Sequence, residues 1–407
     1  MNNPLSVYRH LPRAIYVLSF ATLVNSVANF VYPFLVLYLT TRLSYSAAQA
    51  GRFMTLTALL YVPFSLLGSV IADHFGRKRL MITTQLCMAV VCFLCGWIDG
   101  SPAIPVLILI ALGFDGMCDP ARTALKTDVT TPENRQASFS LVYLSMNLGY
   151  TVGPMIGGLL FSSHIRWLFW GNAIALAAST IPVALLVPES NPTAEEIRKS
   201  RQGNAADRAE EGSLFHALRT RPLLLLFAVG MTFFSFGYSQ MSFALPLFFT
   251  DLFGSQGALQ YGRIMAFNSV IVVVGNPLVI SQAKRLPPLR NLAGAAVLFM
   301  LGFLPFIWTR RLWVLYLAAL VFTVGEILWV NNERTFVANH TPISHRARFG
   351  AILPIIEGTG QALAPFAGGA IIDRLSMDWL WITSIISFFI GAMIILALSQ
   401  KKWRESQ

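Results

Sequence analysis

The amino-acid sequence predicts an all-α membrane protein with twelve transmembrane helices, arranged as two pseudo-symmetric six-helix bundles. Three observations support this class: an apolar composition, twelve apolar runs of membrane-spanning length, and residue patterns that occur once in each half. Hydrophobic residues make up 55% of the 407 residues and charged residues only 12%, whereas soluble domains carry roughly 25% charged residues. A chain this apolar is expected to fold in lipid.

Apolar runs of about 20 residues, the length that crosses a bilayer, occur twelve times along the chain. We expect them at 14–40, 47–72, 80–98, 103–126, 137–162, 167–187, 222–249, 257–281, 291–309, 312–337, 349–372 and 377–399. Short polar turns join most of these runs, but the connector at 188–221 is longer and charged. The sequence therefore predicts an N-terminal bundle at 1–187, a cytoplasmic linker at 188–221 and a C-terminal bundle at 222–407.

The basic residues indicate how the helices are oriented. The net charge is +11, and most of the 30 Lys and Arg residues fall in the linker, in the terminal segments and in alternate turns. An excess of Lys and Arg on one side of the membrane is typical of cytoplasmic loops. We therefore expect a multi-pass protein with both termini and the linker in the cytoplasm. This distribution also explains the net charge without nucleic acid as a partner.

The two halves of the sequence resemble each other at an offset of about 211 residues. The segment G-R-F-M at 51–54 returns as G-R-I-M at 262–265, and the glycine–proline pattern at 149–158 returns at 360–369. Because these matches keep the same order, we infer an internal duplication. Two related bundles are the architecture of an alternating-access transporter.

The turn between the second and third runs reads G-S-V-I-A-D-H-F-G-R-K-R at 68–79. It resembles the signature loop of the major facilitator superfamily, G-x-x-x-D-R-x-G-R-K, although Ser69 stands at the first glycine and His74 replaces the arginine. The resemblance covers essentially the whole chain and implies the major facilitator fold in a bacterial inner (cytoplasmic) membrane. It also implies a cytoplasmic gate, in which Arg77 would pair with Asp128 and Asp73 would face the start of the eleventh helix. The residues of this gate are Gly68, Asp73, Gly76, Arg77, Lys78 and Asp128.

The fifth run carries a second motif, G-Y-T-V-G-P-M-I-G-G at 149–158. It is similar to the G-x-x-x-G-P-x-x-G-G element that marks the drug–proton antiporters of the same superfamily. Glycines four residues apart let helices approach closely, and the proline removes a backbone hydrogen bond and allows a bend. The resemblance therefore implies an antiporter motif at Gly149, Gly153, Pro154, Gly157 and Gly158.

Charged residues within the apolar runs are costly to bury and are usually functional. A carboxyl group in an apolar cavity can take up and release a proton, which is the physical basis of proton coupling. The proton-coupling candidates are Asp115, Asp119, Glu326 and Glu357. Among them, Asp115, Glu326 and Glu357 are preferred because no cation adjoins them in the sequence. We expect structural ion pairs between Asp119 and Arg122 and between Glu333 and Arg334.

In the fold that the resemblance implies, the first, fourth, seventh and tenth helices line a central cavity. The first and seventh runs are rich in amides and aromatic residues, which suit amphiphilic or aromatic ligands. The substrate-cavity candidates are Asn25, Asn29, Tyr32, Arg122, Phe236, Tyr238, Gln240 and Arg334. For any single aromatic residue among them, contact with lipid is the simpler explanation.

The sequence contains no phosphate-binding loop, helical zinc motif or nucleophile elbow, so we expect no enzyme, no metal site and no cofactor beyond the proton gradient. The expected function is proton-coupled export of lipophilic drugs or similar amphiphilic compounds by a monomer. Its expected partners are a small lipophilic substrate, protons and membrane lipids. A lipid or lysolipid flippase and a proton-coupled metabolite transporter remain alternatives on the same fold. A membrane sensor is disfavoured because the linker and tails offer no signalling domain.

Overall fold

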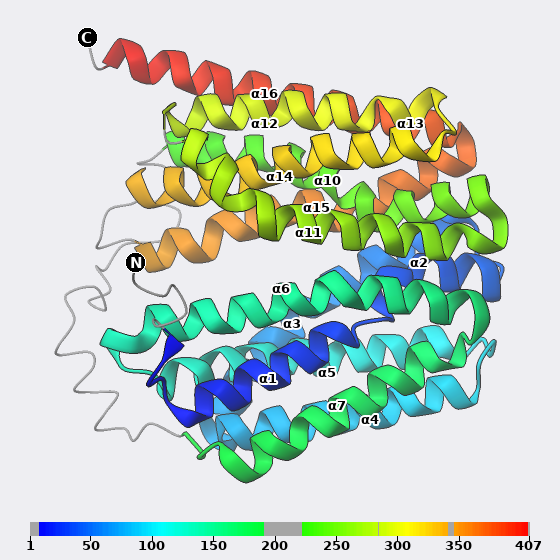
Figure 1. Cartoon of the computed structure of the whole chain (residues 1–407), viewed down its shortest axis with the longest axis vertical. Helices are drawn as coiled ribbons and strands as arrows, with labels where there is room; N and C mark the ends of the chain where they lie inside the picture. The colour runs from blue at the N-terminus through cyan, green and yellow to red at the C-terminus, as the bar shows by residue number, and fades with distance from the viewer. Residues whose placement is uncertain (1–7, 191–221, 284, 341–345, 406–407) are drawn as a thin grey trace. The chain divides into compact units, whose positions relative to one another are not determined.

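The structure is a computed structural model of the chain, and it describes residues 8–190, 222–283, 285–340 and 346–405. Within these ranges the regular secondary structure is helical throughout, with no strand (Figure 1). The prediction of an all-α fold is therefore confirmed for the described part of the chain. Several helices begin at a proline, whose fixed φ angle and missing N–H suit the first helical position.

The long helices of the N-terminal half follow the expected runs closely. They are α1 (Arg13–Val27), α3 (Ala47–Phe75), α4 (Arg77–Trp97), α5 (Ile104–Asp128), α6 (Pro132–Ser163) and α7 (Arg166–Leu186), with the short α2 (Leu35–Leu37) between α1 and α3. The helices of the C-terminal half are α10 (Pro222–Phe253), α11 (Gly257–Ala283), α12 (Pro288–Phe303), α13 (Pro305–Trp308), α14 (Leu312–His340), α15 (Arg346–Arg374) and α16 (Met377–Glu405).

By length and composition, nine stretches of the described residues can cross a membrane. One of these stretches, Leu223–Ala283, contains both α10 and α11. The glycine-rich helices α6 and α15 fall outside the nine. Each expected span still corresponds to a long helix or, for the first span, to α1 and the short helices that follow it. The structure is thus consistent with the predicted arrangement of twelve spans.

The first expected span, 14–40, is not one continuous helix. α1 ends at Val27, the chain leaves the helix at 28–31, and short helical segments follow from Tyr32 to Arg42. Pro33 explains the break, because proline lacks an N–H and its ring clashes with the carbonyl group four residues earlier. Non-helical backbone at membrane depth is tolerated where it is buried in protein or lines a cavity.

The chain divides into two compact units. The first unit comprises Met1–Tyr45, Leu56–Asn191 and Phe249–Ser269, and the second comprises Ser46–Thr55, Pro192–Phe248 and Val270–Gln407. Each unit therefore includes one short segment from the other half of the sequence. The linker predicted at 188–221 stays a prediction, because residues 191–221 lie outside the described residues.

The core of the first unit joins four helices around one buried cluster. In this unit α4 packs against α5 and α7, and α1 packs against α6 and α7. The cluster includes Leu18, Met81, Leu125 and Val183, one from each of α1, α4, α5 and α7. Between membrane-spanning helices such side chains contribute through close van der Waals packing, because lipid tails are as apolar as the side chains themselves. This packing holds the polar faces of α1 and α5 in fixed positions.

The core of the second unit is built largely from aromatic rings. In this unit α12 packs against α14 and α16. Phe299 of α12 stacks on Phe388 of α16 with ring centroids 4.7 Å apart, and Phe234 of α10 meets both rings edge-on. Stacked and edge-on arrangements are the favoured geometries of aromatic pairs. The aromatic cluster therefore ties α10, α12 and α16 together.

Many large apolar side chains are exposed rather than buried. Leu185, Trp97 and Leu278 expose 76%, 70% and 68% of their surface. Exposure of this extent is expected of helices that face hydrocarbon. These exposed side chains therefore support the assignment of the chain to the membrane.

Candidate functional site

A polar cavity of about 330 Å³ lies within the first unit. Its walls come from α1, from the break after α1, and from α4, α5, α6 and α7. The lining residues are Leu18, Ala21, Thr22, Asn25, Ser26, Asn29, Met81, Met88, Asp115, Asp119, Arg122, Lys126, Met146, Tyr150, Asn172 and Leu176. The cavity therefore combines charged groups on α5 with amides on α1 and α7 and with apolar and thioether side chains.

The charges of the cavity lie along one face of α5. The guanidinium of Arg122 lies 3.4 Å from the carboxylate of Asp115 and 3.6 Å from that of Asp119. It also contacts the sulfur of Cys118 at 3.3 Å. Lys126, one turn further along, lines the same cavity. Two carboxylates and two cations therefore share this space.

The expected ion pair between Asp119 and Arg122 is present in the structure. Asp115 also has a cationic partner, which differs from the sequence pattern, where no cation adjoins it. The reason is geometric: Asp115 and Arg122 are seven residues apart, so two helical turns bring them onto the same face. Arg122 thus bridges the two aspartates.

Several of the predicted cavity residues meet in this cavity. Asn25, Asn29 and Arg122 line it together with the two aspartates, whereas Tyr32 is not among its lining residues. Asn25 is held in place by Ser179 of α7, whose hydroxyl donates a hydrogen bond of 2.7 Å to the Oδ1 of Asn25.

Sequence reasoning missed other members of the cavity, including Thr22, Ser26, Lys126, Tyr150 and Asn172. Helical spacing could have found some of them, because Thr22, Ser26 and Asn29 repeat at intervals of four and three. From the sequence, Lys126 is expected to be a cytoplasmic charge, because it lies at the end of the fourth apolar run. In the structure it lies one helical turn from Arg122 and lines the cavity.

The glycines of the fifth-run motif pack against α1 where α1 ends. A Cβ atom on Gly153 would lie 2.7 Å from the carbonyl oxygen of Val27, and one on Gly149 would lie 2.8 Å from the backbone nitrogen of Val27. Both distances are too short for a real side-chain atom, so only glycine permits this approach. Gly157 packs in the same way against the ring of Phe34, beyond the break. The motif therefore shapes the broken first helix, next to the cavity.

The equivalent glycines of α15 repeat this arrangement in the second unit. Gly360, the counterpart of Gly149, lies directly against the backbone of Thr232 on α10. Gly369, the counterpart of Gly158, lies against the backbone of Ala47 at the start of α3. At the end of α15, the carboxylate of Asp373 accepts hydrogen bonds of 3.1 Å from the N–H groups of Ala47 and Ala48. The duplication seen in the sequence is thus also a duplication of packing.

The turn that begins α4 holds part of the predicted cytoplasmic gate. Arg77 forms an ion pair with Asp128 at the end of α5, and the hydroxyl of Ser190 donates a hydrogen bond of 2.6 Å to the same carboxylate. Gly68 packs against the backbone of Met117. The side chain of Asp73 and those at the start of α15 lie outside the described residues, so the expected contact between them stays a prediction.

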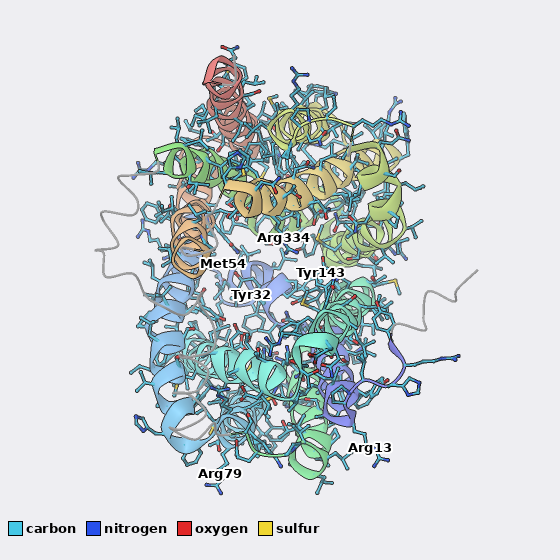
Figure 2. The ribbon with its side chains drawn as sticks, turned by 90° about the vertical axis from the view of Figure 1, so that its left-hand side faces the viewer. Arg13, Tyr32, Met54, Arg79, Tyr143 and Arg334 are labelled. Carbon is cyan, nitrogen blue, oxygen red and sulfur yellow. The ribbon has the colours of Figure 1, made fainter. Side chains whose placement is uncertain are left out.

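Glu189, which the sequence does not mark as functional, caps this turn. Its two carboxylate oxygens accept hydrogen bonds from the backbone N–H groups of Lys78 and Arg79, at 2.8 and 3.1 Å. Gly76 has a φ angle of 100°, a conformation that glycine adopts without strain. The side chain of Arg79 projects outward (Figure 2), and 72% of it is exposed. Glu189 therefore satisfies the free N–H groups at the start of α4.

The candidates of the second unit lie in helix packing rather than around the described cavity. Gln240 is fully buried, and its amide donates a hydrogen bond of 3.0 Å to the carbonyl oxygen of Ala364. Tyr238 packs edge-on against Phe299 and Trp329. Phe236 is half-buried on α10, and Glu326 and the exposed Arg334 stand on α14. Glu357 accepts a hydrogen bond of 3.0 Å from Ser235.

Comparison with known proteins identifies the family. The sequence model of the Major Facilitator Superfamily matches residues 18–352. The chain is 25% identical over 365 residues to a Na(+), Li(+), K(+)/H(+) antiporter of Planococcus maritimus, covering 83% of this chain and 84% of that protein. It is also 25% identical over 380 residues to the multidrug resistance protein MdtH of Yersinia pestis (strain Pestoides F), covering 92% and 90% of the two chains.

Solved structures show the same fold at low sequence identity. The nucleoside transporter NupG superposes with a TM-score of 0.75 at 13% identity, over 95% of this chain and 99% of that one. A POT family transporter in complex with 5-aminolevulinic acid superposes with a TM-score of 0.73 at 17% identity, over 96% of both chains. The chain therefore belongs to the Major Facilitator Superfamily and is a membrane transporter rather than an enzyme.

Proposed function

We propose that this transporter exports lipophilic cationic or neutral compounds in exchange for protons, by alternating access between the two sides of a bacterial inner membrane. The observation that carries the proposal is the cavity of the first unit, where paired charges on α5 face apolar and thioether side chains beside a broken helix. In this proposal the protein works as a monomer with both termini in the cytoplasm, and its energy comes from the proton gradient.

The lining of the cavity suits an amphiphilic substrate. Leu18, Met81, Met88, Met146 and Leu176 provide an apolar wall, and methionine side chains adapt to ligands of different shape. A volume of about 330 Å³ falls at the lower end of the range for small-molecule pockets. A lipophilic compound would therefore find apolar contact together with polar groups that orient it.

The polar side of the cavity can hold one charged or polar group of the substrate. The Nε of Arg122 is buried and has no hydrogen-bond partner among the described residues. A substrate oxygen could accept from it, and a cationic substrate could displace Arg122 from Asp115 or Asp119. Because Arg122 and Lys126 already balance the two aspartates in the cavity, a cationic group would have to displace one of them from a carboxylate.

Proton coupling requires at least one carboxyl group that changes protonation during the cycle. The candidates remain Asp115, Asp119, Glu326 and Glu357, which stand on membrane-spanning helices. The gate residues at the start of α4 and the glycine motif of α6 supply the parts that would open and close the path. The names of two relatives, an antiporter and a multidrug resistance protein, support the same reading.

The test uses the purified full chain in liposomes that hold a pH-sensitive dye and an acidic lumen. A quaternary lipophilic cation is added outside, because it cannot carry a proton across the bilayer by itself. Antiport moves the cation inward and protons outward, so the lumenal pH rises. Protein-free liposomes and the variant Glu133→Gln, which changes an exposed residue of α6, are the controls.

A response to several unrelated lipophilic compounds supports the proposal, and a response to none of them contradicts it. A response to one lysolipid or one metabolite alone replaces drug export with one of the alternatives on the same fold. The same liposomes should also be challenged with Na⁺, Li⁺ and K⁺, because Asp115, Asp119, Asn25 and Asn29 place oxygen atoms around one cavity. Monovalent cation/proton antiport is therefore a second candidate function, and Arg122 between the two carboxylates weighs against it.

A further inference from the structure

One buried carboxylate holds two arginines at the end of the first unit where α4 ends and α7 begins. The side chain of Asp99 is only 3% exposed, and one of its oxygens lies 2.8 Å from the guanidinium of Arg42 and 3.8 Å from that of Arg166. Its other oxygen accepts a hydrogen bond of 2.9 Å from the hydroxyl of Tyr38. The N–H of Gly100 donates a hydrogen bond of 3.0 Å to the same hydroxyl. The position of the carboxylate is therefore fixed from two sides.

The two arginines keep most of their hydrogen-bond donors. Arg42 donates a hydrogen bond to Asp99, whereas 3.8 Å is too long for one, so Arg166 is held near the carboxylate by charge attraction alone. A guanidinium has five N–H donors, and no other hydrogen bond or ion pair joins either guanidinium to a residue that the structure describes. The two arginine side chains are 48% and 58% exposed. A ligand from outside the protein can therefore reach these donors.

The cluster carries one positive charge more than Asp99 balances. One arginine is enough to neutralise a buried carboxylate, so the ion pair itself does not require the second. Membrane topology does not require it either, because Lys and Arg gather in cytoplasmic turns, and this end of α4 lies opposite the basic turn at 77–79. The unbalanced positive charge at this position favours a negatively charged ligand.

Aromatic rings accompany the arginines along α4 and α7, which pack side by side (Figure 1). Trp167 follows Arg166 directly, and its ring centroid lies 5.7 Å from that of Trp170. On α4, the ring centroid of Phe93 lies 6.3 Å from that of Trp170 and 6.4 Å from that of Trp97. Trp97 and Trp167 are 70% and 46% exposed. Exposed tryptophans are typical of the membrane–water interface, so the arginines lie at the depth of the lipid headgroups.

Packing fixes this aromatic surface in place. Phe169 of α7 packs edge-on against Tyr38, with ring centroids 5.1 Å apart. The indole N–H of Trp170 donates a hydrogen bond of 3.3 Å to the carbonyl oxygen of Phe93. A Cβ on Gly96 would lie 2.5 Å from the Trp170 ring, so this ring fills the space that any other side chain would need. The arginines and the tryptophans therefore belong to one preformed surface.

We propose that Arg42 and Arg166 bind the phosphate of an anionic phospholipid, whose acyl chains lie along the exposed tryptophans of α4 and α7. Guanidinium groups suit phosphate oxygens because they offer paired, charge-assisted hydrogen bonds. A headgroup that also carries an ammonium group gains less, since Asp99 is buried and already paired and offers it no free oxygen. The site therefore prefers a lipid with a net negative charge. The two arginines do not line the cavity on α5, so this assignment is independent of the transport reaction proposed above.

Thermal unfolding of the purified full chain in a nonionic detergent tests the site. Phosphatidylglycerol, phosphatidylcholine with the same acyl chains, and inorganic phosphate are titrated separately, because a ligand that binds the folded state raises the melting temperature. We expect a saturable rise with phosphatidylglycerol and no comparable rise with the other two. Arg166→Gln leaves the pair of Asp99 and Arg42 in place and should weaken phosphatidylglycerol binding about tenfold, as the loss of one charge-assisted hydrogen bond implies. Arg166→Lys keeps the charge without the paired donors and should give an intermediate affinity.

Arg311→Gln is the matched control, because Arg311 is exposed near Trp313 in the second unit and pairs with no carboxylate among the described residues. The assignment is overturned if this control weakens binding as much as Arg166→Gln, since any exposed arginine near a tryptophan would then suffice. Equal stabilisation by phosphatidylcholine or by inorganic phosphate also overturns it, because the site would then not recognise an anionic lipid. If Arg166→Gln does not fold, Arg166→Lys decides, and an affinity equal to that of the parent overturns the assignment.

Discussion

The guanidinium of Arg122 lies 3.4 Å from the carboxylate of Asp115, although two helical turns separate the two residues on α5. A second carboxylate, that of Asp119, lies 3.6 Å from the same guanidinium. Arg122 therefore holds two negative charges in place on one wall of the cavity. This relationship makes α5 the charged wall of the site, with α1 and α7 supplying amides opposite it.

Removal of the Arg122 charge should destabilise the first unit and impair transport. Arg122→Gln removes the guanidinium that lies between the two carboxylates and leaves Lys126 as the remaining cation of the cavity, which is costly in a partly buried site. Because Asp115 and Asp119 are 35% and 49% exposed to the cavity, we expect a loss of about 1–2 kcal/mol rather than the full cost of a buried pair. Thermal unfolding of the purified protein measures this loss, and Arg290→Gln at an exposed position is the control. An unchanged melting temperature would show that the pairing contributes nothing to stability.

The glycines of α6 should tolerate no added methyl group where they meet α1. In Gly153→Ala the new Cβ would lie 2.7 Å from the carbonyl oxygen of Val27, so that α6 and α1 must separate. We expect transport to fall by about an order of magnitude or more, since overpacking of a tight contact typically costs 1–3 kcal/mol. Gly294→Ala is the matched control, because the space around Gly294 on α12 is open. Equal activity of the two variants would contradict the role of this contact.

The glycine pattern of α15 offers a parallel test in the second unit. A Cβ on Gly360 would meet the backbone of Thr232 on α10, as one on Gly149 would meet the backbone at the end of α1. We therefore expect Gly360→Ala and Gly149→Ala to impair transport to a similar degree. Initial rates of substrate uptake in liposomes compare them directly. Full activity in only one of the two variants would mean that the two equivalent glycine contacts do not contribute equally to transport.

The capping of α4 by Glu189 should be visible in local exchange rates. Glu189→Ala removes the acceptor for the N–H groups of Lys78 and Arg79, and the loss of a helix cap costs about 1 kcal/mol. We expect hydrogen exchange at these two amides to accelerate by roughly fivefold, as 1 kcal/mol implies. Glu189→Gln retains one acceptor and should give an intermediate rate. Unchanged exchange in Glu189→Ala would show that water replaces the cap at no cost.

A buried aspartate that the sequence did not single out should stabilise one end of the first unit. The side chain of Asp99 is only 3% exposed, and its carboxylate lies 2.8 Å from Arg42 and 3.8 Å from Arg166. It also accepts a hydrogen bond of 2.9 Å from the hydroxyl of Tyr38. Asp99→Asn keeps an acceptor but removes the charge, and we expect a loss of about 1–3 kcal/mol in thermal stability. Asp251→Asn, at an exposed position, should cause no comparable change.

The sequence by itself determined the class of fold, the family and the internal duplication. These features depend on local properties: the length of apolar runs, glycine spacing and the position of charges relative to the membrane. These features can be predicted without the tertiary structure, because the backbone groups of an apolar run have no water to bond in lipid. Each run must therefore form a helix that satisfies its own hydrogen bonds. The same local reasoning predicted the ion pair between Asp119 and Arg122 on α5, which is present in the structure.

Only the tertiary structure decided which distant residues meet. The approach of Gly149 and Gly153 to the end of α1 and the capping of α4 by Glu189 both join segments far apart in the chain. Likewise, Asp99 has no basic neighbour in the sequence but meets Arg42 and Arg166 of other segments. The physical reason is that a helix presents neighbouring residues to different faces, so that the packing of helices, and not the order of residues, selects the partner of each charge.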